Sequence, residues 1–490
     1  MTMNKPIRTI SIFCLLLFLA LMVNATYLQY QAAGDLNDDP RNRRVIDAAY
    51  SRERGAILVG RDSVAISKPV DDQFEFLRTY PQPFKYAPVT GFFSYTYGAS
   101  GIERSQNDVL SGEDSRLFVT RLVDLVSNDD SEGGNVQLTL DAAAQDAAYD
   151  GLSALGPGTR GSVVALQPSS GKVLAMVSLP TYDPNNLSSH DFTEVRETWT
   201  RLNDDPAKPL LNRAIQTTLP PGSTFKVLTA AAAIEAGLYT ADDLVPGGAS
   251  YQLPLTRGES GLIDNEGRAC GTDRIPFTQA MEQSCNTTFA ALAGEVGAER
   301  MLETAEAFGF NSEYLEDLRP QAESVYPDKL NAAELGQTGI GQFEVRATPL
   351  QMAMVVAGIA NGGVVMRPYV VDEVQSADYE VLDKTPAREL SQAVKPQTAD
   401  EVTELMVATV ENGTAAPAAI QGVEVAGKTG TAQSGDPDRP PYAWFVSFAP
   451  DEDVAVAVVI ENADISRSEI AGGTLGGPIA KAVMEAVIRQ

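Results

Sequence analysis

The N-terminal segment places the strongest constraint on how this chain can fold. No residue from Thr9 to Gly34 is charged, and Ile10 to Val23 is almost continuously apolar. Such a stretch exceeds the roughly 20 residues that a helix needs to cross a bilayer. We therefore predict an uncleaved membrane helix within residues 1–34. The alternative, a cleavable signal peptide, would be cut near the small residues at 23–25.

Flanking charges bear on the orientation of this helix. Lys5 and Arg8 precede the apolar run and favour a cytoplasmic N-terminus. The arginines at 41, 43 and 44 follow it and weaken that charge bias. We predict a single-pass protein of the cytoplasmic membrane whose remaining chain is extracytoplasmic, an orientation that rests partly on the chemistry below.

The composition excludes several classes of function. Acidic residues outnumber basic ones by 65 to 37, and the formal charge of −28 makes nucleic acid an unfavourable partner. His190 is the single histidine, which removes most histidine-based metal sites and a Ser-His-Asp triad elsewhere in the chain. We predict neither a metal nor a cofactor.

After the helix, the chain divides by composition into two parts. Residues 35–154 contain short strand-like runs and no long helix until about Ala142, which predicts a mainly β or mixed pedestal. From residue 155 the pattern is that of an α/β domain ending at 490. A hairpin opens it, helices follow, and three strands come near its end, so we expect one antiparallel sheet flanked by helices.

A serine and a lysine near the start of one apolar helix carry the first sign of chemistry. Pro221 and Gly222 stop the incoming chain, so Ser223 falls in the first helical turn. The spacing places Lys226 on the same face, where a neutral amine can take the hydroxyl proton. A second Ser-x-x-Lys, at 169–172, lies in the predicted hairpin turn and has the wrong geometry for this task.

Two further short motifs follow in the same domain. Ser284 and Asn286 flank Cys285 at a break between helical stretches, where they can relay a proton and hold a substrate amide. The run Lys428, Thr429, Gly430, Thr431 lies in an apparent strand. Its lysine supplies positive charge, its threonines can donate to a carboxylate, and its glycine lets a backbone approach closely.

Each motif alone is weak, but their order and placement in one domain resemble the serine β-lactamases and penicillin-binding proteins. Outside the motifs, other stretches resemble the monofunctional class B penicillin-binding proteins: Arg54-Gly55-Ala56-Ile57, Gly101-Ile102-Glu103, Leu138 to Asp141, Tyr182 to Asn185, and Gly336-Gln337 leading to Thr348 to Gln351. The anchor and the size of the first module also fit class B.

This resemblance implies a peptidoglycan D,D-transpeptidase that β-lactams inhibit. Ser223 would attack the penultimate D-Ala carbonyl of a stem peptide, with Lys226 as general base. Ser284 would pass a proton to the leaving D-Ala, Asn286 would position the peptide, and Lys428 would bind the terminal carboxylate together with Thr429 and Thr431. The oxyanion hole would be formed by the backbone N–H groups of Ser223 and Thr431. A membrane glycan polymerase of the SEDS type is the implied partner.

Other readings share the same residues. A membrane-anchored D,D-carboxypeptidase or β-lactamase would use the same acylation residues with water as acceptor, and a wall-synthesis scaffold would need no catalysis. A penicillin sensor would need a cytoplasmic effector, for which about eight residues before the apolar run leave little room. The sequence does not discriminate a septal role from one in elongation.

Cys270 and Cys285 are close enough in sequence to form a disulfide in an oxidising exterior. The alternative is a pair of buried free thiols. A bridge would fix the second motif covalently, because Cys285 is its middle residue.

Overall fold

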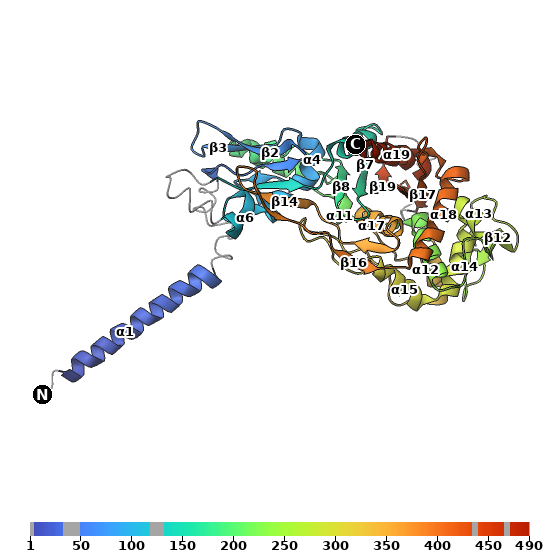
Figure 1. Ribbon diagram of the computed structural model, residues 1–490, viewed down its shortest axis with the longest axis horizontal. Helices are drawn as coiled ribbons and strands as arrows, with labels where there is room; N and C mark the ends of the chain where they lie inside the picture. The colour runs from blue at the N-terminus through green and yellow to red at the C-terminus, as the bar shows by residue number, and fades with distance from the viewer. Residues whose placement is uncertain (1–3, 33–49, 118–131, 434–439, 465–470, 490) are drawn as a thin grey trace.

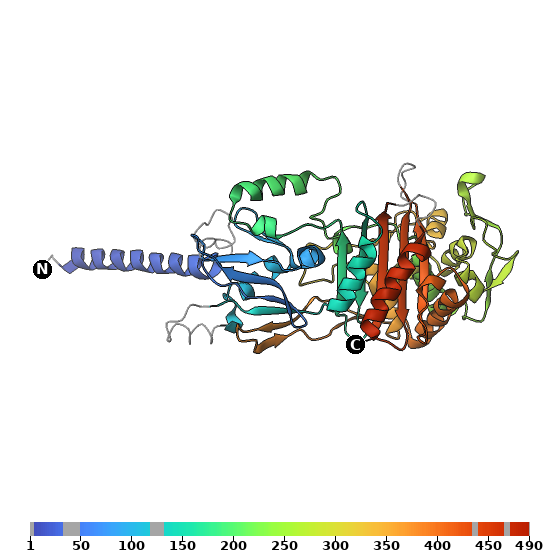
Figure 2. The same ribbon diagram turned by 90° about the horizontal axis from the view of Figure 1, so that it is seen from above.

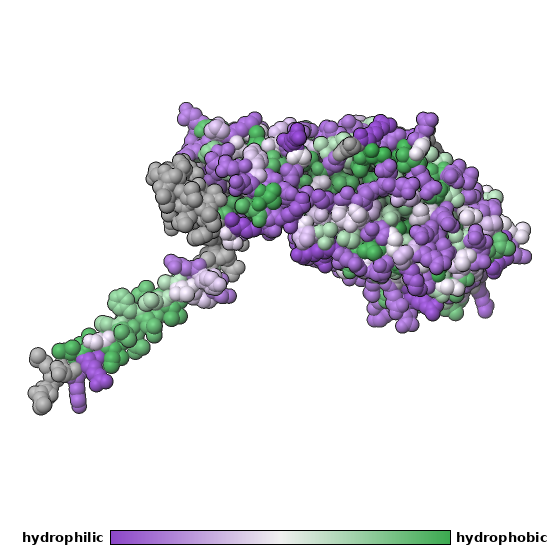
Figure 3. Space-filling model, viewed as in Figure 1, coloured by the Kyte–Doolittle hydropathy of each residue, from purple (hydrophilic) through white to green (hydrophobic). Residues whose placement is uncertain are grey.

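The computed structural model describes residues 4–32, 50–117, 132–433, 440–464 and 471–489. One long helix, α1 (Asn4–Thr26), extends away from the folded part of the molecule and continues as the π-helical turn η1 (Tyr27–Gln31) (Figure 1). Its surface is apolar over most of its length (Figure 3). Residues 7–31 are long and apolar enough to cross a membrane, in agreement with the predicted anchor.

The folded part nearer to α1 is built on a six-stranded sheet with the order β15-β14-β6-β1-β2-β3. Only the β1–β6 pair is parallel among these described strands. The sheet agrees with a mainly β or mixed pedestal. Its strands are β1 (Ile57–Val59), β2 (Asp62–Pro69), β3 (Phe76–Thr79), β6 (Asn135–Leu138), β14 (Val371–Gln375) and β15 (Val381–Lys384).

A buried cluster of charges holds the pedestal together. Arg54 Nε lies 2.7 Å from one carboxylate oxygen of Glu103, and Arg78 Nε lies 2.6 Å from the other. The hydroxyl of Tyr80 also donates to this carboxylate. Burial by itself raises the pKa of Glu103, but Arg78 and Arg54 outweigh it, and the pKa lies below its ordinary value. Two of the sequence stretches that resemble class B proteins therefore meet in one ion cluster.

The second folded part contains a five-stranded antiparallel sheet with the order β17-β18-β19-β7-β8. The predicted hairpin joins the three last strands, as expected. The strands are β7 (Arg160–Leu166), β8 (Val173–Leu179), β17 (Ala426–Ala432), β18 (Tyr442–Ala449) and β19 (Val454–Asn462).

Helices cover both faces of this sheet (Figure 2). On one face lie α8 (Ala142–Ser153) and α19 (Gly477–Ile488), and on the other lie α11 (Arg213–Gln216) and the almost wholly buried α17 (Pro349–Ala360). Further helices beyond α17 include α12 (Lys226–Glu235), α13 (Phe277–Glu282), α14 (Asn286–Val296) and α18 (Pro396–Asn412). The functional site lies at the edge strand β17.

Two features of the structure bear on the predicted boundary at 154/155. Helix α8 buries Ala144, Ala148 and Leu152 against the five-stranded sheet and α19, so it belongs with the second part. Strands β14 and β15 return from the second part to complete the pedestal sheet. Composition cannot reveal this, because the pairing of β14 with β6 joins segments far apart in sequence. The other predicted boundary, at 34/35, lies outside the described residues.

Candidate active site

Ser223 lies in a short 3-10 turn, η3 (Gly222–Phe225), that leads directly into α12. Residues three apart eclipse each other in a 3-10 turn, so Ser223 and Lys226 lie on one face. Gly222 has a φ of +54°, and a Cβ there would lie 2.9 Å from the Cβ of Ala432. The turn is therefore held tightly against β17, with Ser223 half-buried and Lys226 fully buried.

Ser284 occupies an unusual backbone position between α13 and α14. Its φ is +56°, a left-handed conformation that ordinarily favours glycine. The N–H of Cys285 donates to Ala280 O, and the N–H of Ser284 donates to Met281 O, which together form a Schellman C-cap of α13. This cap turns the Ser284 hydroxyl toward both lysines at a backbone cost on the order of 1 kcal/mol.

The two lysines and the second motif form one hydrogen-bonded cluster. Lys226 Nζ donates to Ser284 O at 2.8 Å, to Ser284 Oγ at 3.2 Å and to Asn286 Oδ1 at 2.7 Å. Lys428 Nζ donates to the same Ser284 Oγ at 2.8 Å. Ser284 therefore bridges the lysines of the first and third motifs. Among the described residues these contacts, and no hydrogen bond to Ser223, hold the Lys226 amine.

Burial lowers the pKa of both lysines, so each amine holds its proton less firmly than it would in water. Burial, with Lys428 and Arg268 nearby, holds the pKa of Lys226 well below its ordinary value. Burial and Arg268 lower the pKa of Lys428 to about 7. The lowered pKa makes the neutral amine of Lys226 easier to form than in water, which favours its use as a general base.

The residues of the third motif divide between the interior and the cleft. Lys428 is fully buried and reaches Ser284, whereas Thr429 and Thr431 line the open cleft. A Cβ on Gly430 would lie 2.9 Å from Thr224 Cγ2 and 3.1 Å from Pro221 O. Gly430 therefore permits the close approach of β17 to the turn that carries Ser223.

An open cleft of about 410 Å³ lies above this cluster. Ser223, Ser284 and Asn286 line it together with the two threonines of the third motif. Sequence reasoning missed most of the other lining residues, because they come from loops without a motif: Leu253, Ser260, Leu262, Ile263, Asp264, Glu266, Arg268, Ile340, Gln342 and Gln433. Gln337 also lines the cleft, and the stretch Gly336-Gln337 was the one signal for it.

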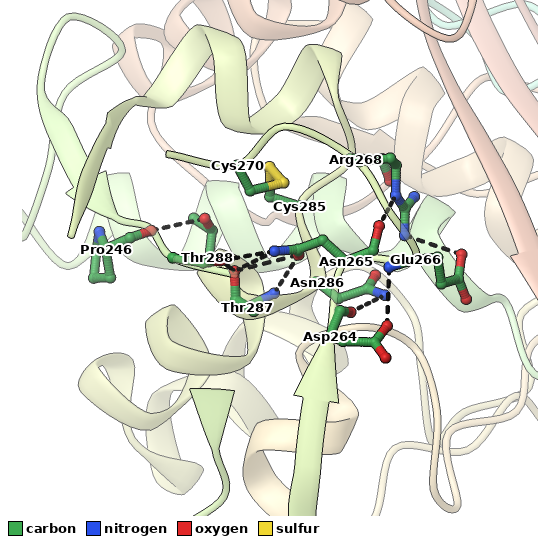
Figure 4. The surroundings of a disulfide bond; sticks show 12 residues. Pro246, Asp264, Asn265, Glu266, Arg268, Cys270, Cys285, Asn286, Thr287 and Thr288 are labelled. Atoms are coloured by element: carbon green, nitrogen blue, oxygen red, sulfur yellow. Dashed lines mark hydrogen bonds and ion pairs between the residues drawn. A yellow bond between two sulfur atoms is a disulfide. The ribbon is translucent and has the colours of Figure 1, made fainter. Parts of the chain in front are cut away.

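A disulfide joins Cys270 to Cys285, next to Ser284 (Figure 4). The side-chain amide of Asn286 is engaged at both ends: its oxygen accepts from Lys226 and its nitrogen donates to Asp264 O at 2.9 Å. Asn286 therefore orients the lysine and anchors the loop that contains the other cysteine.

The second Ser-x-x-Lys does not line this cleft. It occupies the turn between β7 and β8, where Ser169 Oγ contacts Asp453 and Lys172 Nζ lies 2.8 Å from Asp372. Its lysine is paired with a carboxylate and does not line the cleft.

Comparison with known proteins identifies this arrangement. Residues 161–485 match the family described as penicillin binding protein transpeptidase domain. The chain belongs to the penicillin-binding protein transpeptidase family. Residues 54–136 match the penicillin binding protein A dimerisation domain, and this range includes strands β1, β2 and β3 of the pedestal.

Relatives of this penicillin-binding protein match it along its length. It is 43% identical over 495 residues to the peptidoglycan D,D-transpeptidase PbpA of Mycolicibacterium smegmatis, with 100% of both chains covered. Penicillin-binding protein A from M. tuberculosis, in its ceftriaxone acyl-enzyme complex, is 42% identical with a TM-score of 0.85 over 90% of this chain and 100% of that one. Its penicillin G acyl-enzyme complex has a TM-score of 0.82 over 89% of this chain and 100% of that one.

Replacing Gly430 should separate β17 from the nucleophile turn. We expect Gly430→Ala to slow penicillin acylation by about 10²-fold, because a displacement near 1 Å misaligns the reacting groups. Gly294→Ala is the matched control, since a Cβ there meets only Tyr251 Oη at 3.9 Å. Stopped-flow acylation kinetics of both variants test this, and an unchanged rate in Gly430→Ala would show that the close approach is unimportant.

Proposed function

We propose that this protein is a peptidoglycan D,D-transpeptidase that works through an acyl-enzyme on Ser223 and that β-lactams inhibit. The observation that carries the proposal is the cluster beneath the cleft. A half-buried serine lies one turn before a buried lysine of lowered pKa, and that lysine contacts both polar residues of the second motif.

The first half-reaction uses this cluster in order. Lys226 takes the proton of Ser223 as Oγ attacks the penultimate D-Ala carbonyl. The backbone N–H groups of Ser223 and Thr431 stabilise the oxyanion, and each such donor typically contributes about 10² to 10³ in rate. Ser284 then passes a proton from Lys226 to the leaving D-Ala nitrogen, a role that its contacts with both lysines support.

The third motif binds the terminal carboxylate of the donor. Thr429 and Thr431 line the cleft and donate to the carboxylate. Lys428 supplies charge from below the cleft, where its Nζ donates to Ser284 Oγ. Asn286 keeps Lys226 in place while the stem peptide binds beside it. In the second half-reaction an amine from a neighbouring stem peptide resolves the acyl-enzyme.

The location of the reaction sets the orientation of the chain. Helix α1 anchors the protein in the cytoplasmic membrane, with Lys5 and Arg8 on the cytoplasmic side and the folded part outside. A disulfide fits that compartment. A SEDS-type glycan polymerase, which acts in the same membrane, would contact α1 and the pedestal.

The proposal is tested by supplying both substrates of the reaction. We expect the full-length protein in detergent, given a stem pentapeptide donor and an amine acceptor, to release D-alanine and form the cross-linked peptide. Ser223→Ala should form neither product. Mass spectrometry that finds only the hydrolysed tetrapeptide would make the protein a carboxypeptidase, and no reaction in the wild type would favour a scaffold.

A further inference from the structure

One wall of the cleft carries side chains to which the mechanism above assigns no contact with the substrate. It is formed by β11 (Leu262–Asp264) and the loop that follows, and it places apolar Leu262 and Ile263 next to the charged side chains of Glu266 and Arg268. Leu262 is 44% exposed, which is high for a leucine that borders a site. The wall thus offers an aliphatic strip that ends in a carboxylate and a guanidinium.

The loop that carries the two charges is firmly held (Figure 4). Between them and β11 lies Asn265, which is 3% exposed and whose amide nitrogen donates to Gly248 O at 2.8 Å. The oxygen of Asn265 accepts from the N–H of Thr287 at 3.1 Å. The Cys270–Cys285 disulfide fixes the far end of the loop. Such anchoring holds the backbone that carries Glu266 and Arg268 in place before any ligand binds.

The ion pair between these side chains does not explain their presence. Arg268 Nη2 lies 3.1 Å from Glu266 Oε2, but the Glu266 side chain is 68% exposed, and exposed pairs stabilise a fold little. Arg268 Nε donates to Asn265 O at 2.7 Å, and Nη1 has no hydrogen bond among the described residues. The carboxylate of Asp264 is already engaged by the N–H of Glu266. Arg268 Nη1 and the second carboxylate oxygen of Glu266 therefore remain available to a ligand in the cleft, and the exposed pair between the two side chains can open to admit it.

We propose that Glu266 and Arg268 form a subsite for the zwitterionic end of a diamino acid in the stem peptide. Its methylene groups lie along Leu262 and Ile263, its ammonium pairs with Glu266, and its carboxylate pairs with Arg268, the side chain best shaped for carboxylates. This inference rests on the proposed function. The diamino acid can belong to the donor peptide or to the acceptor, and the two arms of the experiment separate these sources.

The donor arm uses the full-length protein and three tripeptides ending in D-Ala-D-Ala. Their first residue is meso-diaminopimelic acid, lysine or norleucine. Lysine lacks the side-chain carboxylate of diaminopimelic acid, and norleucine lacks the side-chain ammonium as well. For each, kcat/KM for D-alanine release is measured. We expect Arg268→Gln to reduce the preference for diaminopimelic acid over lysine about tenfold, and Glu266→Gln to reduce that for lysine over norleucine about tenfold. Ratios within one variant cancel any general effect of Arg268 on the catalytic lysines.

The acceptor arm uses a thioester donor without a diamino acid, and it measures the ratio of aminolysis to hydrolysis with D-norleucine and with pentylamine. A loss of the preference for D-norleucine in Arg268→Gln, with donor ratios unchanged, assigns the subsite to the acceptor. Arg257→Gln and Glu259→Gln, in the exposed loop before β11, are the controls. Ratios that stay within about twofold of wild type in both arms overturn the subsite. A wild type that releases no D-alanine from any donor overturns the proposed function itself.

Discussion

Lys226→Met should slow acylation of Ser223 by penicillin by a factor of about 10² to 10⁴, the usual contribution of a general base. Methionine is unbranched like lysine and only one atom shorter, but it cannot act as a base. The fully buried amine is the group with a lowered pKa one turn from the nucleophile, so its removal leaves the hydroxyl without a base. Single-turnover kinetics with a chromogenic cephalosporin measure the rate.

Lys172→Met is the matched control for this experiment. It removes the lysine of the second Ser-x-x-Lys, whose amine pairs with Asp372 instead of facing the cleft. We expect its acylation rate to equal that of wild type. Thermal unfolding of both variants excludes a general loss of structure. A Lys226→Met protein that is folded and still acylates at the wild-type rate would contradict the assignment of the base.

Glu103→Ala should destabilise the pedestal by about 3–5 kcal/mol, because it leaves two buried arginines without a counter-charge. The carboxylate is fully buried, and Arg54 and Arg78 that pair with it are also buried. Because a chain of two folded parts need not unfold in one step, the measurement is hydrogen exchange on peptides from β1 and β6 at increasing denaturant.

Glu113→Ala serves as the comparison for Glu103→Ala. Its side chain is 46% exposed and lies 3.7 Å from an equally exposed Arg52, so we expect a change below about 1 kcal/mol. Similar exchange in the two variants would show that the buried ion cluster does not stabilise the pedestal. Loss of protection confined to the pedestal would show in addition that the two folded parts unfold separately.

Much of this architecture could be predicted because local sequence carries it. The hairpin of β7 and β8 could be predicted because two apolar runs flank a turn at 168–171. The start of the apolar helix could be predicted because Pro221 and Gly222 precede Ser223. The order of the three motifs then indicated that they meet in one site. Long-range pairing was not predictable: β14 joins the pedestal through β6, and only tertiary packing places α8 on the second sheet.

The site shows the same limit. The predicted site residues lie together in the structure, but the contacts that Lys428 and Gly430 make could not be predicted. The buried amine of Lys428 reaches Ser284, and Gly430 contacts the nucleophile turn, because β17 packs edge-on against η3. Glu266 and Arg268 belong to no motif. Their place in the cleft follows from the hydrogen bonds of Asn265 and from the Cys270–Cys285 disulfide, which hold the loop. Such loop positions require a structure.

The most direct test of the central claim is the intact mass of the full-length protein after incubation with penicillin G, beside Ser223→Ala. We predict one drug added per wild-type chain, stable over hours, and none on the variant. Peptide mapping should place the adduct on Ser223. A wild-type mass that stays unchanged while the drug is hydrolysed would mean rapid deacylation, and an adduct that persists in Ser223→Ala would contradict Ser223 as the nucleophile.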